Sequence, residues 1–556
     1  MTTNDQVVNC KACFLGGADI SHQSPHSYHK KTLVATAVNE QTRSSATPQL
    51  RKDMPTHQKR WGGRTFRFSL MSFRPGKGVS LRRFSIVEAA LLLMMAYMAS
   101  RGLGVVRQTI FNALFGTELQ ANAYYAAARL PETLFNLIAG GALSHAFIPV
   151  FLTYEKDHDQ REAWRLTSLV FNVLLVMLTA SLLLGEFLTP VLVNTLLVPG
   201  YSASEQVLVT DLTRIMLVQP LLLGLGTIVT AVLNSKRQFL LPALSIAVYN
   251  FGLIGGLLLT LAFPKFGIYG PTYGVLVAAT LQVVVMIPGL LKQGLRYTFT
   301  WDLRHPGLIE VMRLLIPNAL AVGVGSLGPV LDTNFASYFP DLASLAALHN
   351  AQMLFALPFA LLAQAIGQAA LPQWSVQAAF GRYVRLRQTA IKVIGVSILL
   401  SLPCALLLYV LGKPTIRILF QHGAFTAHSS ALTNIALIGY AVGIPGLTAG
   451  EMLARGFIAL KDARTPLFTN LFALVARFGF IVLLLQVFTG SLVILAIPLA
   501  TSISGTLEAV LLCLVLLLRL NAKVRTDKGM QRLHQQRKRS LSLKKKTKER
   551  VPEQEE

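Results

Sequence analysis

The sequence predicts an all-α polytopic membrane protein, with about twelve transmembrane helices in two six-helix lobes around a central cavity. Its composition is the first reason. Hydrophobic residues make up 53% of the 556 residues, charged residues make up only 14%, and the mean hydropathy is +0.52. A soluble domain carries about 25% charged residues. The second reason is that apolar runs of about 20 residues, the length that crosses a bilayer, recur from residue 84 to residue 520.

Residues 1–83 form a basic N-terminal extension before the first apolar run. This extension is polar and has no hydrophobic periodicity, so we expect it to be disordered and cytoplasmic. Between Lys59 and Arg83 basic residues alternate with aromatic ones, a pattern typical of a tether to membrane lipids. Nucleic-acid binding is the alternative and is not expected. Met71 is a second candidate start of translation.

Six apolar spans define a predicted N-terminal lobe over 84–293, and six more define a C-terminal lobe over 309–520. The spans of the first lobe are 84–112, 121–152, 165–190, 207–233, 240–263 and 269–291. Those of the second lobe are 311–338, 343–374, 388–411, 428–456, 466–488 and 491–519. The second and eighth spans are longer than one crossing requires, so we expect breaks within them.

The charge of the loops indicates the number and direction of these spans. With the N-terminus in the cytoplasm, the inner loops together with the first few residues of the spans that follow them carry fifteen Lys and Arg residues, and the outer loops carry three. The positive-inside rule predicts such an asymmetry. An even number of spans then places both termini in the cytoplasm.

Residues 521–556 form a basic C-terminal tail. The formal net charge of +25 comes largely from the two ends of the chain and from short loops. We expect a solvated cytoplasmic tail that contacts anionic membrane lipids. A nucleic-acid-binding tail is the alternative.

Charged residues inside the spans are the candidate functional positions, because charge is costly within a bilayer. Arg101 and Arg107 lie in the first span, about 120° apart on a straight helix. For Arg107, a contact with the outer interface is the alternative. Arg129 and Glu132 are three residues apart in the second span and can form an ion pair. This surplus of arginine suits an anionic ligand, since guanidinium groups bind phosphate in bidentate fashion.

Asp332, in the seventh span, has no charged residue near it in the sequence. It is therefore our candidate for coupling transport to a cation or a proton. An ion pair with Arg477 of the eleventh span is the alternative.

Enzymatic motifs do not stand out in this sequence. We find no phosphate-binding G-x-x-x-x-G-K-[ST] loop, no catalytic Ser/His/Asp set and no metal-ligand cluster. Cys10 and Cys13 form a lone CxxC pair, which implies neither a metal site nor a disulfide framework. We therefore expect a transporter without cofactors, driven by an ion gradient or the membrane potential.

Several stretches together resemble the MurJ/MviN family of lipid II flippases, in the family's order and over about residues 84–520. The first is SRGLGVVR at 100–107, which is similar to the family's first-helix signature. The others are FG at 115–116, NAYY at 122–125, RLP at 129–131, GGALSHAFIP at 140–149, LFQHGAF at 419–425 and RGFIALKDARTP at 455–466.

The resemblance implies the two-lobed fold of the multidrug/oligosaccharidyl-lipid/polysaccharide exporter superfamily. It implies transport of an undecaprenyl-pyrophosphate-linked peptidoglycan precursor from the inner to the outer leaflet of a bacterial plasma membrane by alternating access. Arg101 and Arg107 match the family's cavity arginines, and Ser100 matches the serine beside them. These residues, helped by Arg129, would bind the pyrophosphate or the headgroup. Membrane lipids and the cell-wall synthesis machinery are the implied partners.

The sequence also departs from the family pattern. Acidic residues of the family are replaced by Gln108 and Asn122, and two arginines are missing near Phe135 and Met353. The two additional C-terminal helices of typical members are absent from the sequence after Leu520. A flippase for another polyprenyl-linked oligosaccharide is therefore the main alternative. A cation-coupled drug antiporter fits less well, because surplus arginine would repel cationic drugs, and a non-transporting scaffold is the remaining alternative.

Overall fold

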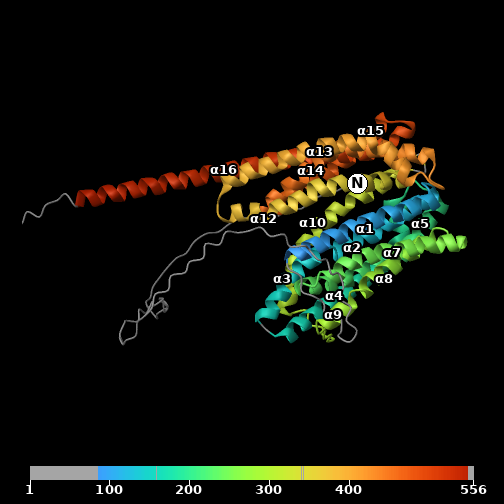
Figure 1. The fold of residues 1–556 in the computed structure, drawn as a ribbon, viewed down its shortest axis with the longest axis horizontal. Helices are drawn as coiled ribbons and strands as arrows, with labels where there is room; N and C mark the ends of the chain where they lie inside the picture. The colour runs from blue at the N-terminus through green and yellow to red at the C-terminus, as the bar shows by residue number, and fades with distance from the viewer. Residues whose placement is uncertain (1–85, 158, 340, 342–343, 549–556) are drawn as a thin grey trace, which may run out of the picture. The chain divides into compact units, whose positions relative to one another are not determined.

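The computed structural model describes residues 86–157, 159–339, 341 and 344–548, and these ranges contain helices and loops but no strand (Figure 1). Eleven segments of them are long and apolar enough to cross a membrane. α1 (Ile86–Phe115) is a further helix of 30 residues, which at 1.5 Å per residue exceeds the roughly 30 Å of a bilayer's apolar core. The predicted all-α polytopic fold is confirmed. The N-terminal extension, with Cys10 and Cys13, lies outside the described residues.

The first half of the chain, which we call the N-terminal lobe, contains α1 to α9. After α1 its helices are α2 (Leu119–Ile138), α3 (Gly141–Asp157), α4 (Gln160–Leu192), the π-helical turn η1 (Val193–Leu197), α5 (Ala203–Met216), α6 (Val218–Ser235), α7 (Leu240–Ala262), the 3-10 turn η2 (Pro264–Phe266), α8 (Tyr269–Val284) and α9 (Ile287–Lys292). The expected break in the second span is confirmed, because α2 ends and α3 begins around Ala139 and Gly140.

The second half, the C-terminal lobe, contains α10 to α16. Its helices are α10 (Pro306–Ala336), α11 (Ser344–Phe359), the π-helical turn η3 (Ala360–Ala365), α12 (Ile366–Ala379), α13 (Tyr383–Phe420), α14 (Ala427–Ala459), α15 (Arg464–Val487), the 3-10 turn η4 (Gly490–Leu495) and α16 (Ala496–Lys548). α10 packs against α2 and α3 of the other lobe as well as against α15. α10 therefore follows the N-terminal lobe in the chain and also packs against helices of both lobes.

The eighth predicted span contains the π-helical turn η3 but runs as one continuous helical segment over Ser344–Ala379, so the expected break is here only a local change of helix type. A π-helical turn leaves carbonyl oxygens without their usual partners. Here Arg455 of α14 donates hydrogen bonds from Nη1 to the carbonyls of Ala363 and Gln364, at 2.9 and 2.8 Å. Its Nη2 donates to Glu451 at 2.8 Å. Arg455 therefore joins α14 to the π-helical turn of the neighbouring segment.

α16 continues from the membrane-spanning part of the chain to Lys548 as one helix (Figure 1). The predicted boundary at residue 520 thus marks a change in composition and not the end of a helix. Arg519 forms an ion pair with Asp462, which precedes α15, and Lys523 lies 4.9 Å from the ring centre of Tyr383. The proposed contact between the tail and membrane lipids remains a prediction.

Asp462 lies where α15 begins, and its carboxylate accepts hydrogen bonds from the backbone amides of Arg464 and Thr465. Burial raises the pKa of this carboxyl. Hydrogen bonds from Thr465, the positive charge of Arg519 and the Arg464 amide outweigh that effect, so the pKa lies below its usual value. The resulting stabilisation is present at neutral pH and is lost as the pH falls through the lowered pKa.

We expect Asp462→Ala to destabilise the protein by about 1–2 kcal/mol, because it removes the acceptor of the first two backbone amides of α15 and the partner of Arg519. Thermal unfolding of the purified protein measures this as a lower Tm. Asp302→Ala is the matched control, since Asp302 also accepts a backbone hydrogen bond in an exposed loop but has no ion-pair partner among the described residues. Equal Tm values for the two variants would refute the assignment.

Candidate functional site

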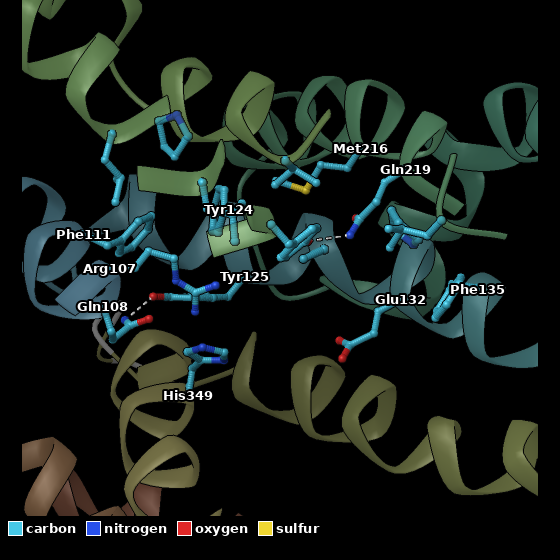
Figure 2. A pocket seen from close by; sticks show the side chains of 18 of the residues that line it. Arg107, Gln108, Phe111, Tyr124, Tyr125, Glu132, Phe135, Met216, Gln219 and His349 are labelled. Atoms are coloured by element: carbon cyan, nitrogen blue, oxygen red, sulfur yellow. Dashed lines mark hydrogen bonds between the residues drawn. The ribbon is translucent and has the colours of Figure 1, made fainter. Parts of the chain in front are cut away.

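A cavity of about 360 Å³ lies in the N-terminal lobe, and one side chain of the C-terminal lobe contributes to it (Figure 2). Helices α1, α2, α6, α7 and α8 supply most of its walls, and α11 supplies His349. Its polar and aromatic lining residues are Arg107, Gln108, Phe111, Tyr124, Tyr125, Glu132, Phe135, Asn136, Gln219, Tyr249 and His349. The cavity therefore combines one arginine with amides, aromatic rings and a carboxylate.

Arg107 of α1 is the cationic side chain among the cavity's lining residues. It is half-buried, and within the described part of the chain it makes no hydrogen bond or ion pair. A guanidinium group remains charged at any working pH and presents its donors in a planar fork. Arg107 is therefore free to bind an anion that enters the cavity.

The other residues predicted to bind the substrate lie outside the lining of this cavity. Ser100 accepts a hydrogen bond from the Asn250 side chain of α7 at 2.9 Å, and Arg101 is exposed. Arg129 donates to Glu132 at 3.3 Å, which is the ion pair that the spacing indicated. The structure thus places Arg107 alone of the four in the cavity. A substrate-binding role for Ser100, Arg101 and Arg129 remains a prediction.

Asp332 of α10 forms an ion pair with Arg477 of α15, which is the alternative that the sequence left open. The exposed fractions of the two side chains are only 11% and 14%. Gly328 makes room for the guanidinium group, because a Cβ there would lie 2.8 Å from Nη1 of Arg477. A coupling cation would have to compete with this guanidinium for the carboxylate. The coupling role of Asp332 remains a prediction.

Beside the cavity, four buried side chains and the half-buried His349 form a cluster between the two lobes that we call the interlobe latch: Gln108, Asn112, Tyr125, His349 and Asn350. The Asn350 side-chain oxygen accepts hydrogen bonds from Gln108 and Asn112, each at 2.9 Å. Gln108 also donates to the Tyr125 hydroxyl at 2.6 Å, and the Tyr125 ring stacks on His349 with 4.0 Å between ring centres. The latch borders the cavity directly, because Gln108, Tyr125 and His349 also line it.

Backbone contacts also join the two lobes near the ends of α1 and α13. The amide of Ala424 donates to the carbonyl of Ala113 at 2.9 Å. Gly116 and Gly423 adopt φ angles of 59° and 57°, and a Cβ on either would lie within 2.4 Å of a carbonyl oxygen of the other lobe. Asn122 accepts a hydrogen bond from the Ala346 amide at 2.6 Å. In this conformation the contacts between the two lobes thus depend on glycines and on neutral amides.

In the sequence, Gln108 and Asn122 are recognisable only as departures from a family pattern, and His349 and Asn350 were not predicted as functional residues. The one available signal was the polar pair His349-Asn350 within the apolar eighth span. It does not reveal a partner in the first helix, because Asn350 and Gln108 are separated by 242 positions.

Comparisons with known proteins agree on one family. A family model described as "Lipid II flippase MurJ" matches residues 111–543. The lipid II flippase MurJ of Burkholderia cenocepacia is 30% identical over 389 residues, which cover 68% of this chain and 74% of that protein. The probable lipid II flippase MurJ of Rhizobium tropici is 28% identical over 78% of this chain and 81% of that protein.

Solved structures also match most of the chain. A lipid II flippase MurJ in an inward closed conformation matches with a TM-score of 0.66 and 25% identity, over 76% of this chain and 87% of that chain. A multidrug resistance MATE family transporter in an inward-facing conformation matches with a TM-score of 0.66, over 79% of this chain and 99% of that chain. At 14% identity, this second match shows a shared fold alone.

Proposed function

This chain belongs to the lipid II flippase MurJ family, and from that premise we propose that it moves lipid II from the inner to the outer leaflet of a bacterial plasma membrane. Lipid II is the undecaprenyl-pyrophosphate-linked precursor of peptidoglycan. The observation that carries the proposal is Arg107, a cavity cation without an anionic partner among the described residues. A pyrophosphate supplies the negative charge and the oxygen acceptors that such a guanidinium group binds.

The transport cycle that we propose is alternating access. The headgroup enters the cavity and its pyrophosphate binds Arg107, while the polyprenyl tail stays in the bilayer. Loop charge orients the chain with both termini in the cytoplasm. In that orientation α1 ends at the outer face, and the interlobe latch closes the cavity on that side. Opening of the latch then releases the headgroup outward.

The driving force in this proposal is an ion gradient or the membrane potential, since the sequence carries no nucleotide-binding loop. Asp332 remains the candidate for ion coupling. Its ion pair with Arg477 would then have to open and close during the cycle. The cell-wall synthesis machinery is the class of partner that would use the exported precursor.

Complementation tests the proposed substrate. The full chain is expressed in bacteria depleted of their own lipid II flippase, and we expect growth and cell shape to be restored. An empty vector is the control, and membrane insertion is verified for each strain. A chain that inserts normally and restores export of another polyprenyl-linked oligosaccharide, but not growth, would show that lipid II is not its substrate.

A further inference from the structure

The cavity has a neutral wall in addition to Arg107. Tyr124 of α2, Gln219 of α6 and Tyr249 of α7 all line it. The Gln219 side-chain amide donates to the Tyr249 hydroxyl at 2.9 Å. Figure 2 shows Gln219 and Arg107 at different ends of the pocket. The neutral wall and the cation can therefore contact different parts of one ligand.

The hydrogen bond between Gln219 and Tyr249 leaves two groups available. The side-chain oxygen of Gln219 can accept a hydrogen bond, and the Tyr249 hydroxyl can donate one. Neither group makes a second hydrogen bond within the described part of the chain. A ligand with adjacent hydroxyls satisfies both, because each hydroxyl is a donor and an acceptor.

Aromatic and apolar side chains complete this part of the cavity. The Tyr124 ring lies 5.0 Å from Phe111, with an angle of 44° between the ring planes, and Met216 and Leu253 also line the cavity. The face of an aromatic ring carries partial negative charge and attracts polarised C–H groups. A pyranose presents such C–H groups on its face and hydroxyls around its rim. A phosphate diester can accept a hydrogen bond from the Tyr249 hydroxyl, but it has no hydroxyl to donate to Gln219 and no C–H face to place on an aromatic ring.

The volume of the cavity limits what can be bound. At about 360 Å³ it lies near the lower end of the roughly 300–1,000 Å³ of ligand pockets. In this conformation it suits one sugar ring and a phosphate group, and it is too small for a whole sugar-peptide headgroup.

We propose that Tyr124, Gln219 and Tyr249 form a subsite for the sugar that is attached directly to the pyrophosphate, while Arg107 binds the pyrophosphate itself. This inference rests on the proposed function. It adds that the headgroup is recognised through its sugar and not through charge alone. A site built to pair with hydroxyls discriminates strongly against ligands that lack them.

Two lipids with the same anion and tail test the subsite. The purified full chain, reconstituted in lipid nanodiscs, is titrated with lipid II and with undecaprenyl pyrophosphate, which has no sugar. We expect the unmodified chain to bind lipid II at least tenfold more tightly. Gln219→Leu and Tyr249→Phe should each weaken lipid II binding about tenfold and leave undecaprenyl pyrophosphate binding unchanged. Arg107→Gln should weaken the binding of both lipids.

Binding of undecaprenyl pyrophosphate also verifies that the Gln219→Leu and Tyr249→Phe variants are folded. Tyr409→Phe is the matched control, because Tyr409 of α13 is 61% exposed and lies outside the cavity. Equal affinity of the unmodified chain for the two lipids would overturn the subsite and leave the proposed function intact. The same weakening of both lipids by Gln219→Leu and Tyr249→Phe would also overturn it. Absence of binding to either lipid would overturn the subsite together with the proposed function.

Discussion

Arg107→Ala is expected to abolish the rescue of flippase-depleted cells, although the variant protein inserts normally. The substitution removes the cation that lines the cavity, and each hydrogen bond from a charged group contributes about 1.5–3 kcal/mol. Loss of a bidentate contact with pyrophosphate should therefore weaken binding by roughly a hundredfold or more. Arg107→Lys keeps the charge but loses the planar fork, so we expect partial rescue.

Growth of the depleted cells at equal membrane levels of each variant measures this effect. Arg417→Ala is the matched control, because Arg417 is exposed and lies outside the cavity. Arg101→Ala adds a useful comparison, since the exposed position of Arg101 predicts a weaker effect than that of Arg107. Full rescue by Arg107→Ala would contradict the proposed phosphate contact.

Asn350→Ala is expected to open the outer end of the cavity. It removes the oxygen that accepts hydrogen bonds from the side-chain amides of Gln108 and Asn112. Both amides are buried when the lobes are closed, and each then lacks this acceptor. Each lost hydrogen bond costs about 1–1.5 kcal/mol. The closed state should therefore lose roughly ten- to a hundredfold in relative population.

The opening can be followed with one reporter cysteine at Ala128, which lines the cavity, in a chain whose native cysteines are replaced by serine. Asn350→Ala should raise the rate at which an impermeant maleimide labels this cysteine from outside the cell. Asn318→Ala is the control, because Asn318 is exposed and, among the described residues, its side chain bonds only to the Leu314 carbonyl of its own helix. An unchanged labelling rate for Asn350→Ala would show that the latch does not hold the cavity closed.

The helices could be predicted from the sequence because a bilayer requires long apolar segments. The break in the second span followed from its length for the same reason, whereas the eighth span continues through a π-helical turn. Arg107 could be identified from local information, since it lies in a motif that resembles a family signature. The rotation of α1, which places Arg107 in the cavity and Arg101 outside its lining, depends on helix packing that a sequence motif does not encode.

Contacts between distant parts of the chain could not be predicted in the same way. The Asp332–Arg477 pair joins α10 to α15, and the latch joins α1 and α2 to α11. Each depends on how whole helices pack, and each side chain alone has several plausible partners in the sequence. The neutral wall of Tyr124, Gln219 and Tyr249 is a similar case, because ordinary polar residues on three helices form it only after folding.

We propose that this chain carries lipid II across a membrane with Arg107 in contact with its pyrophosphate. Purified protein in proteoliposomes that contain fluorescent lipid II tests it directly, with an impermeant quencher reporting how fast the headgroup changes leaflet. We expect a translocation rate well above that of protein-free vesicles, and we expect the Arg107→Ala variant to lose it. Translocation no faster than in protein-free vesicles, or equally fast in Arg107→Ala, would contradict it.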